Sequence, residues 1–459
     1  MKLFRLLILV MIISCSEEVL KDVDNTDPFE PVDLPALEIS INEISLPFGG
    51  MTTDDISRTF YDVSGTFIYS NNDAVFAYFP GVADWDPGQS GSALNVTPVS
   101  SQVLIKEDSL WRFHKTDHNL QAWGMRNFEI LGSEVIIGDG NEIGSDASGW
   151  IGDAYIGQIM GNGDISWKLI NEIDEMGYFH GTCAGDLNND GLTDVGVTPG
   201  IGHSGINIFL QNSNGNFTRN DEILNYEGST PFTLDFSDLD GDGIDEIITA
   251  DYGGGNIPDE DDHEIRIYKF DNSTEKFELH FQINEPNAYD WGLGATSIKV
   301  NDFTNDGIMD IAVAREDLEY HGFEVWRGTG NAQFELIFSS PTWTNNEMQF
   351  REFSVFDANQ DGNIDILLRP FHYGTLYRNS ENCWWNVYDC NGVKLNNLIW
   401  LNDGSGNFNY YNEEELLIEG ILVDSFHPYL YDGNLYFVGT FYNDVGDDRL
   451  QMIDVKVNF

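Results

Sequence analysis

Four nine-residue segments of this sequence place oxygen-bearing side chains at alternate positions, with a glycine at position six. Each segment fits the template D-x-[DNT]-x-D-G-x-x-[DE], and the four begin at Asp186, Asp238, Asp302 and Asp357. Several oxygen ligands around a sharp glycine turn are what a hard cation such as Ca²⁺ requires. Without a cation, the carboxylates of one segment would repel one another. The spacing therefore predicts about four structural Ca²⁺ ions, one in each loop.

The residues that flank these loops exclude an EF-hand, which needs a helix on both sides and a bidentate glutamate at position twelve. The loops are followed instead by the short runs "VGVTP", "IITADY", "IAVAR" and "ILLRP". Apolar and β-branched runs bounded by turn residues are typical of β-strands. Each cation loop is therefore expected to join two strands.

The loops belong to a repeat with a period of about fifty residues, which is typical of propeller blades or solenoids. A second signature follows each loop: two short runs around a Gly/Asn-rich turn, ending at Phe217, Phe277, Phe334 or Phe408. This pattern indicates the outer hairpin of a four-stranded unit. Residues 66–114, residues 128–170 and the C-terminal end carry strand signals without a cation loop. Seven such units predict one closed ring.

The combination of cation loop and strands resembles the FG-GAP/VCBS repeat family, which also builds the propeller of integrin α-subunits. The resemblance supports an all-β fold, a seven-bladed β-propeller with Ca²⁺-binding loops in four blades. It implies that side chains at positions one, three, five and nine and the backbone carbonyl of position seven hold the ion. Thr304 offers a hydroxyl where the family has a carboxylate or amide, so its site should be the weakest. The implied ligands are Asp186, Asn188, Asp190, Leu192 and Asp194; Asp238, Asp240, Asp242, Ile244 and Glu246; Asp302, Thr304, Asp306, Ile308 and Asp310; and Asp357, Asn359, Asp361, Asn363 and Asp365.

The N-terminus is expected to be an export signal. Residues 1–14 are typical of a lipoprotein signal peptide, because Lys2 and Arg5 precede an apolar run too short for a transmembrane helix. Cys15 resembles the diacylated cysteine of a bacterial lipobox. Residues 15–45 are acidic and poor in aromatics, which predicts a disordered tether. The propeller is then expected over residues 46–459, with its cation-loop blades at about 175–412, and lipid-anchored at the outer membrane or cell surface.

Three further cysteines would enter an oxidising compartment. Cys383 and Cys390 bracket "WWNVYD" and are predicted to form a local disulfide. Cys183 lies among small residues at the entry to an expected inner strand, which predicts a buried, free thiol.

The formal net charge is −55, from 77 acidic and 22 basic residues. Nucleic-acid-binding proteins carry basic patches, and an anionic lipid surface would repel this chain. The composition therefore argues against nucleic acid as a partner and leaves the lipid anchor as the only membrane contact.

The favoured hypothesis is a binding module for adhesion or capture, whose partner is an extracellular glycan or a surface protein. In an FG-GAP-like blade the face opposite the cation loops collects the other loops, and propellers bind ligands on such a face. Aromatic side chains there can stack on a sugar or a peptide. The candidate ligand-binding residues are Trp291, Trp343, Trp384, Trp385 and Tyr388.

The alternative hypothesis is a polysaccharide lyase acting on uronic-acid glycans. Such an enzyme needs a base and a cationic group that neutralises the uronate carboxylate. The candidate residues are His321, Tyr320, His372, Tyr373, Arg315, Arg351 and Arg369. No spacing motif ties them together, and the sequence contains no G-x-S-x-G, H-E-x-x-H or P-loop motif, so no catalytic role is assigned.

Overall fold

The chain divides into two compact units, residues 1–30 and residues 31–459, and all the residues that the structure describes belong to the second unit. The computed structural model describes residues 37–45, 67–71, 74–79, 99–107, 110–122, 125–139, 153–171, 181–198, 205–227, 231–251, 265–283, 294–316, 320–344, 350–370, 392–394, 398–410, 417–419, 426–442 and 449–459. No helix in these ranges is long and apolar enough to cross a membrane.

The described residues form seven four-stranded antiparallel sheets, which are the blades of a propeller. Blade 1 consists of β2 (Phe67–Ser70), β3 (Val75–Phe79), β4 (Val99–Glu107) and β5 (Leu110–Ala122). Blade 2 consists of β6 (Met125–Leu131), β7 (Glu134–Asp139), β8 (Ala154–Ile159) and β9 (Ile165–Leu169). Blade 3 consists of β10 (Thr182–Gly185), β11 (Asp194–Val197), β12 (Asn207–Gln211) and β13 (Phe217–Arg219), and the 3₁₀ turn η1 (Asp221–Ile223) follows it.

The four cation-loop blades continue from blade 3 to blade 6. Blade 4 consists of β14 (Pro231–Ser237), β15 (Glu246–Asp251), β16 (Ile265–Asp271) and β17 (Lys276–Ile283). Blade 5 consists of β18 (Gly294–Asn301), β19 (Asp310–Glu316), β20 (Tyr320–Gly330) and β21 (Gln333–Ser339), with β22 (Trp343–Thr344) paired to β20. Blade 6 consists of β23 (Phe350–Phe356), β24 (Asp365–Pro370), β26 (Ile399–Asn402) and β27 (Phe408–Tyr410). The short strands β25 (Gly392–Lys394) and β28 (Leu417–Glu419) pair with each other.

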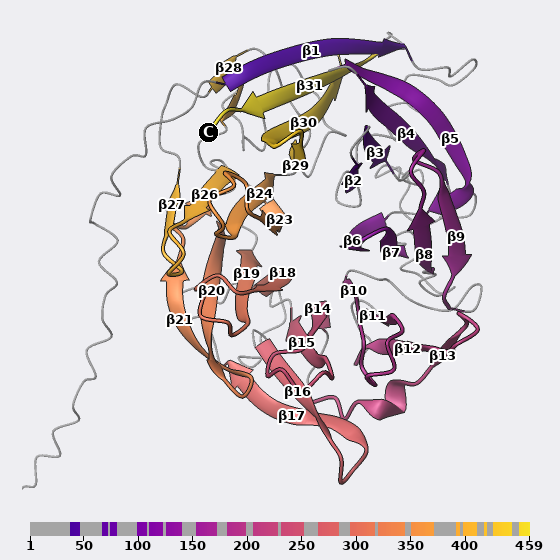
Figure 1. Ribbon diagram of the computed structural model, residues 1–459, viewed down its shortest axis with the longest axis vertical. Coiled ribbons are helices and arrows are strands. Elements are labelled where there is room, and N and C mark those ends of the chain that lie inside the picture. Colours follow the sequence, from indigo (N-terminus) through magenta and orange to yellow (C-terminus); the bar gives the residue numbers. More distant parts are fainter. Residues whose placement is uncertain are drawn as a thin grey trace, which may run out of the picture. The chain divides into compact units, whose positions relative to one another are not determined.

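The first strand of each blade lies nearest the ring axis and the fourth lies at the periphery (Figure 1). The burial pattern follows this order, because β15 and β19 are buried along their whole length whereas β13 and β21 have exposed positions. An ion pair of 2.7 Å between Lys299 of β18 and Glu129 of β6 joins the first strands of two blades that are not neighbours. The ring is therefore tied together at its centre as well as between adjacent blades.

Blade 7 closes the ring with strands from both ends of the propeller. It consists of β29 (Phe426–Tyr431), β30 (Asn434–Tyr442), β31 (Arg449–Val457) and β1 (Leu37–Ser45). Strand β1 pairs with β31 from Leu37 opposite Val457 to Ser45 opposite Arg449. The predicted boundary at residue 46 is therefore wrong, because residues 37–45 belong to the last blade and not to a tether.

The hydrophobic core is a set of layers between neighbouring blades. Separate clusters join blades 7 and 1, 1 and 2, 2 and 3, 3 and 4, and 4 and 5, and one larger cluster joins blades 5, 6 and 7. Across the closure, the buried ammonium of Lys106 also pairs with Asp454. Each blade thus buries both of its faces against its neighbours, which is what a closed propeller requires.

Candidate cation-binding loops

Each of the four acidic segments joins the first and second strands of its blade, as the sequence predicts. In blade 3, the Asp186 carboxylate accepts hydrogen bonds from the backbone N–H groups of Asp190 (3.0 Å) and Gly191 (2.7 Å). The same pair of bonds recurs in the other loops, to Asp238 from Asp242 (3.1 Å) and Gly243 (2.9 Å), to Asp302 from Asp306 (3.1 Å) and Gly307 (2.9 Å), and to Asp357 from Asp361 (3.0 Å) and Gly362 (2.9 Å).

The backbone of each loop turns sharply at positions four and six. The position-six glycines have φ between 78° at Gly191 and 93° at Gly362, in the left-handed region that only glycine enters without strain. Position four is also left-handed, at Asn189, Gly241, Asn305 and Gln360. The aspartate at position five accepts from the position-seven N–H through Oδ1, for example Asp190 from Leu192 at 2.9 Å. Its Oδ2 accepts from the Asn359 amide at 3.0 Å in blade 6 (Asp361) and from the Lys269 ammonium at 3.0 Å in blade 4 (Asp242).

The carboxylate at position nine fastens each loop to the blade. Asp365 is fully buried and accepts from the backbone N–H groups of Ala358 in its own loop and Asn402 in the third strand, both at 2.9 Å. Asp194 accepts from Leu187 (3.1 Å) and Gln211 (2.8 Å) in the same way. Burial raises the pKa of both aspartates to about 6, because desolvation outweighs the two hydrogen bonds. A bound cation would supply the missing counter-charge, so the donor set fits Ca²⁺.

The blade-5 loop departs from this pattern at Thr304. Both its backbone N–H (2.9 Å) and its hydroxyl (3.1 Å) donate to Oδ2 of Asp310. The hydroxyl therefore donates its hydrogen bond to the closing carboxylate, and its oxygen lone pairs can still bind a cation. Asp310 is bound on its other oxygen by the N–H of Gly328 in the third strand, at 2.8 Å.

The blade-4 loop is the most acidic of the four. Carboxylate oxygens of Asp238, Asp240 and Glu246 lie within 4.8 Å of one another, a spacing that can hold a metal ion. Oδ1 of Asp240 is buried and has no hydrogen-bond partner among the described residues. Burial raises the pKa of Glu246 to about 7. The ammonium of Lys269, from the third strand β16, contacts Asp240, Asp242 (3.0 Å) and Glu246 (3.3 Å).

The loops also contact the neighbouring blades. Asp245 of blade 4 accepts from the backbone N–H of Asp186 in blade 3 at 2.5 Å. The Asn305 amide in blade 5 donates to Asn363 in blade 6 at 2.7 Å. Folding of each loop therefore contributes to the contact between blades as well as to its own strands.

The repeat to which the loops belong is confirmed by comparison with known families. The FG-GAP-like repeat matches residues 186–249 and 302–368, which contain all four loops. The chain contains FG-GAP-like repeats within a seven-bladed β-propeller. No curated protein matches its sequence significantly.

Solved structures align with this FG-GAP propeller at low sequence identity. A protein provisionally assigned as a 6-phosphogluconolactonase from Bacteroides uniformis shares 13% identity over 68% of this chain and 82% of its own, with a TM-score of 0.41. A second such protein, from Bacteroides fragilis, shares 10% over 77% and 84%, with a TM-score of 0.43. The periplasmic gluconolactonase of Pseudomonas aeruginosa shares 10% over 67% and 80%, with a TM-score of 0.40. At these TM-scores the alignments support no inference about activity.

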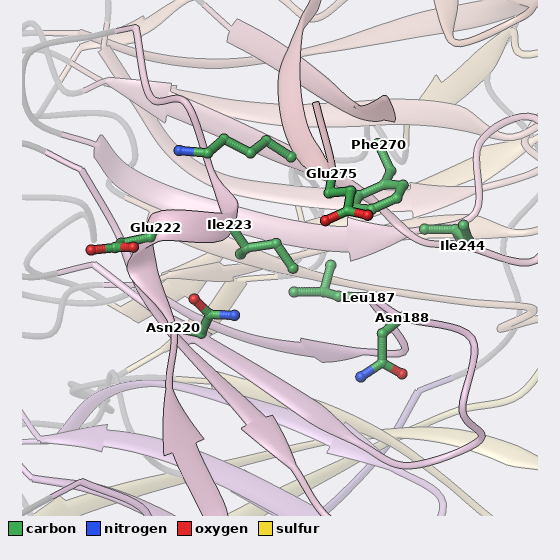
Figure 2. Close-up of a pocket in the computed structure, with 9 residues that line it drawn as sticks. Leu187, Asn188, Asn220, Glu222, Ile223, Ile244, Phe270 and Glu275 are labelled. Atoms are coloured by element: carbon green, nitrogen blue, oxygen red, sulfur yellow. The ribbon is translucent and has the colours of Figure 1, made fainter. Parts of the chain in front are cut away.

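A small recess lies beside the blade-3 loop, against blade 4. Its volume is about 300 Å³, at the lower end of the range for ligand pockets. Figure 2 shows Leu187 and Ile223 of blade 3 facing Ile244 and Phe270 of blade 4 across it. Its polar wall consists of Asn188, Asn220, Glu222, Glu275 and Lys276. The recess adjoins a cation loop, whereas the ligand face was predicted on the other side of the ring.

Several residues predicted to meet a ligand or substrate are buried instead. The prediction for Trp343 is wrong, because its ring is 7% exposed and packs against Phe350 and Trp400. Arg315 is fully buried, and its Nε donates to Oε2 of Glu324 at 3.1 Å. Neither side chain is open to a substrate, because Trp343 packs against blade 6 and Arg315 is fully buried beside Glu324 of its own blade.

His321 and Arg369 are also enclosed by protein. His321 is 3% exposed, with Nδ1 at 3.2 Å from the carbonyl oxygen of Phe350. Arg369 donates to Glu352 at 2.5 Å and lies 3.1 Å from Nδ1 of His427. Burial, followed by the charge of Arg369, lowers the pKa of His427 well below its usual value. These groups pair across blades 5, 6 and 7, so the lyase assignment of His321, Arg315 and Arg369 is not supported by their surroundings.

Cys183 is a buried free thiol in β10, as predicted, and burial raises its pKa. The other predicted site residues cannot be compared with the structure. The side chains of Tyr320 and Arg351 are outside the described part of the chain, although their backbones lie in β20 and β23. Wholly outside the described ranges are Cys15, Trp291, His372, Tyr373, Cys383, Trp384, Trp385, Tyr388 and Cys390.

Lys269 and Asp245 are the residues that sequence reasoning missed. Lys269 lies in "YKFD", more than twenty residues after its loop, and no spacing rule connects the two. Asp245 stands between two predicted ligand positions, where the template accepts any residue.

Proposed function

We propose that this FG-GAP propeller is a Ca²⁺-stabilised, non-catalytic binding module for an extracellular glycan or protein. The observation that carries the proposal is the burial of His321, Arg315 and Arg369, the candidate catalytic residues whose side chains the structure describes. A lyase base must reach a proton on its substrate, and a neutralising cation must reach the uronate. Among the described residues, Arg315 is instead paired with the fully buried Glu324, and Arg369 with Glu352, whose side chain is 14% exposed.

In this proposal, Ca²⁺ is held by the side chains at positions one, three, five and nine and by the position-seven carbonyl. When bound, it supplies the counter-charge that the converging carboxylates lack. The loops lie between strands and contact neighbouring blades, so the ion would stabilise the ring. Chelation by EGTA should then lower the melting temperature, whereas an unchanged melting temperature would contradict the Ca²⁺ assignment.

The ligand is proposed to bind on the face away from the cation loops. The aromatic residues that remain candidates there are Trp291, Trp384, Trp385 and Tyr388. Paired tryptophans between candidate disulfide cysteines are suited to stacking on a sugar ring or an apolar peptide side chain. Surface attachment is proposed through acylation of Cys15, with residues 16–36 spanning up to about 70 Å when extended. Mass spectrometry of the mature N-terminus tests the acylation.

The deciding experiment combines a glycan array with an ultraviolet assay for unsaturated uronates. Binding without new absorbance supports the proposal, and new absorbance near the alkene band supports the lyase instead. The double variant Trp384→Ala/Trp385→Ala should lose binding and keep its melting temperature. Leu110→Ala, which truncates a side chain that is 60% exposed on blade 1, is the matched control and should bind normally. Full binding by the double variant would place the ligand elsewhere.

A further inference from the structure

The Lys269 ammonium lies inside the blade-4 loop and not beside it. It contacts Oδ2 of Asp240, Oδ2 of Asp242 at 3.0 Å and Oε1 of Glu246 at 3.3 Å. These three residues are all implied ligands of the same cation. The side chain of Lys269 is 25% exposed, so its methylene stem is largely covered while its head group meets the loop.

The oxygens that Lys269 contacts are those that a cation would use. In Asp242, Oδ1 accepts from the N–H of Ile244 (3.0 Å), and Lys269 contacts Oδ2. In Glu246, Oε2 accepts from the N–H of Leu239 (2.8 Å), and Lys269 contacts Oε1. The ammonium thus approaches Asp242 and Glu246 on the oxygen that the loop backbone leaves open, and in Asp240 it contacts Oδ2 while Oδ1 has no partner among the described residues. A cation bound to the same oxygens would have to displace it.

Among the described residues, no ammonium contacts any of the other three loops. In blade 4, the residue after the closing carboxylate (Ile247) pairs with Tyr268 of the third strand, and Lys269 follows Tyr268. The same register in blades 3, 5 and 6 places Leu210, Arg327 and Leu401 at the position of Lys269. Two of these are apolar. The guanidinium of Arg327 pairs with Glu335 on the outer strand, where both side chains are about half exposed.

The extra positive charge accompanies an extra negative one. Position three is Asp240 in blade 4, but Asn188, Thr304 and Asn359 in blades 3, 5 and 6. At the implied ligand positions, the blade-4 loop therefore has one more carboxylate than each of the others, and a lysine approaches it. Lys269 contacts three of the four ligand carboxylates, and without it and without a metal no basic side chain among the described residues pairs with them.

We propose that Lys269 is a built-in counter-cation that takes the place of Ca²⁺ in the blade-4 loop. This loop, the richest in carboxylates, then has the weakest affinity for Ca²⁺ of the four and stays folded without it. The inference rests on the proposed Ca²⁺ function of the other three loops. It also replaces the expectation that the Thr304 loop is the weakest.

The test is the number of Ca²⁺ ions bound by the full chain, measured by titration calorimetry and by native mass spectrometry. The wild-type protein should bind three ions tightly, and Lys269→Met should bind four, with affinity for the fourth raised at least tenfold because a unit charge within a few ångströms of the site is removed. Lys269→Gln should do the same if the methionine variant fails to fold. Arg327→Met, which removes a cation at the matched position of blade 5, should leave the count at three.

Equal counts in the wild-type protein and both Lys269 variants would overturn the proposal. A wild-type protein that binds no Ca²⁺ while Lys269→Met binds one would uphold it and refute the Ca²⁺ assignment of the other loops. A second measurement needs no metal. In EGTA, Asp242→Ala should destabilise the wild-type protein more than it destabilises the Lys269→Met variant, because the ion pair between Lys269 and Asp242 is already absent from that variant. Equal losses in the two backgrounds would also overturn the proposal.

Discussion

Gly328→Ala should lower the free energy of unfolding far more than the addition of one methyl group suggests. Gly328 lies in the third strand of blade 5, where its N–H donates to Oδ1 of Asp310 at 2.8 Å. A Cβ atom at this position would lie 2.3 Å from the backbone oxygen of Met309 and 2.8 Å from Cγ2 of Ile308. The strand and the cation loop must therefore separate to admit a methyl group, and the hydrogen bond to Asp310 opens with them.

The expected loss is about 3 kcal/mol in the free energy of unfolding. Overpacking in a tight site costs about 1–3 kcal/mol, and a buried N–H that loses its acceptor adds about 1–3 kcal/mol. Gly191→Ala is the matched control, because nothing lies within 4 Å of its Cβ position and only its φ of +78° opposes a side chain. Left-handed strain of about 1–2 kcal/mol, partly offset by a less flexible unfolded chain, gives a loss of about 1 kcal/mol.

Equilibrium unfolding in guanidinium chloride, followed by tryptophan fluorescence in EGTA, measures both losses without a metal contribution. A second titration with Ca²⁺ should show weaker binding in Gly328→Ala, because the displaced segment carries the Ile308 carbonyl, an implied ligand. A Gly328→Ala loss smaller than that of Gly191→Ala would refute the reasoning, since it would mean that the third strand does not hold the loop.

Three further substitutions test the buried charges. Asp365→Ala should lower the free energy of unfolding in EGTA by about 2 kcal/mol or more, because two buried N–H groups lose their acceptor. Urea unfolding measures this loss, and a variant as stable as the wild-type protein would contradict it. Arg315→Met should lower the free energy of unfolding by about 3–5 kcal/mol, because Glu324 is left buried without the guanidinium. Adding Glu324→Leu should restore most of this stability, and thermal unfolding of the single and double variants checks both. Burial, followed by the charge of Glu129, raises the pKa of Asp235 well above its ordinary value, so its ionised form destabilises the folded state above the unfolded pKa of about 3.9. Asp235→Asn should therefore be more stable than the wild-type protein at pH 8, and this advantage should shrink as the pH is lowered toward 5; an advantage that grows on acidification would show the opposite sign of shift.

The turns of the four acidic loops and the blades could be predicted from the sequence because they are local structures. The template residues of each loop lie within nine positions, and their hydrogen bonds join residues two to five apart, such as Asp186 to Gly191. The outer hairpins are equally local, and β16 and β17 meet at the turn that the sequence indicates before Phe277. Repetition of one local pattern then suffices to indicate a ring, since the hydrophobic faces of each blade pack on its neighbours.

The start of the ring could not be placed in the same way. "LEISINEIS" alternates apolar and polar residues at Leu37, Ile39 and Ile41, which is a strand signal, but it follows an acidic stretch that reads as a tether. Its partner is β31, some four hundred residues later in the chain. Only the closure of the ring brings the two together, and no local pattern records that contact.

The sequence by itself determined which side chains carry charge, and only the tertiary structure decided what each of them faces. Arg315, Lys269 and Trp343 lie in segments whose sequence predicts a strand but does not indicate which face of that strand is exposed. Arg315 meets Glu324 inside the blade, Lys269 meets the cation loop, and Trp343 meets the next blade. A strand directs alternate residues to opposite faces, and whether a face meets water or protein depends on strands from other parts of the chain.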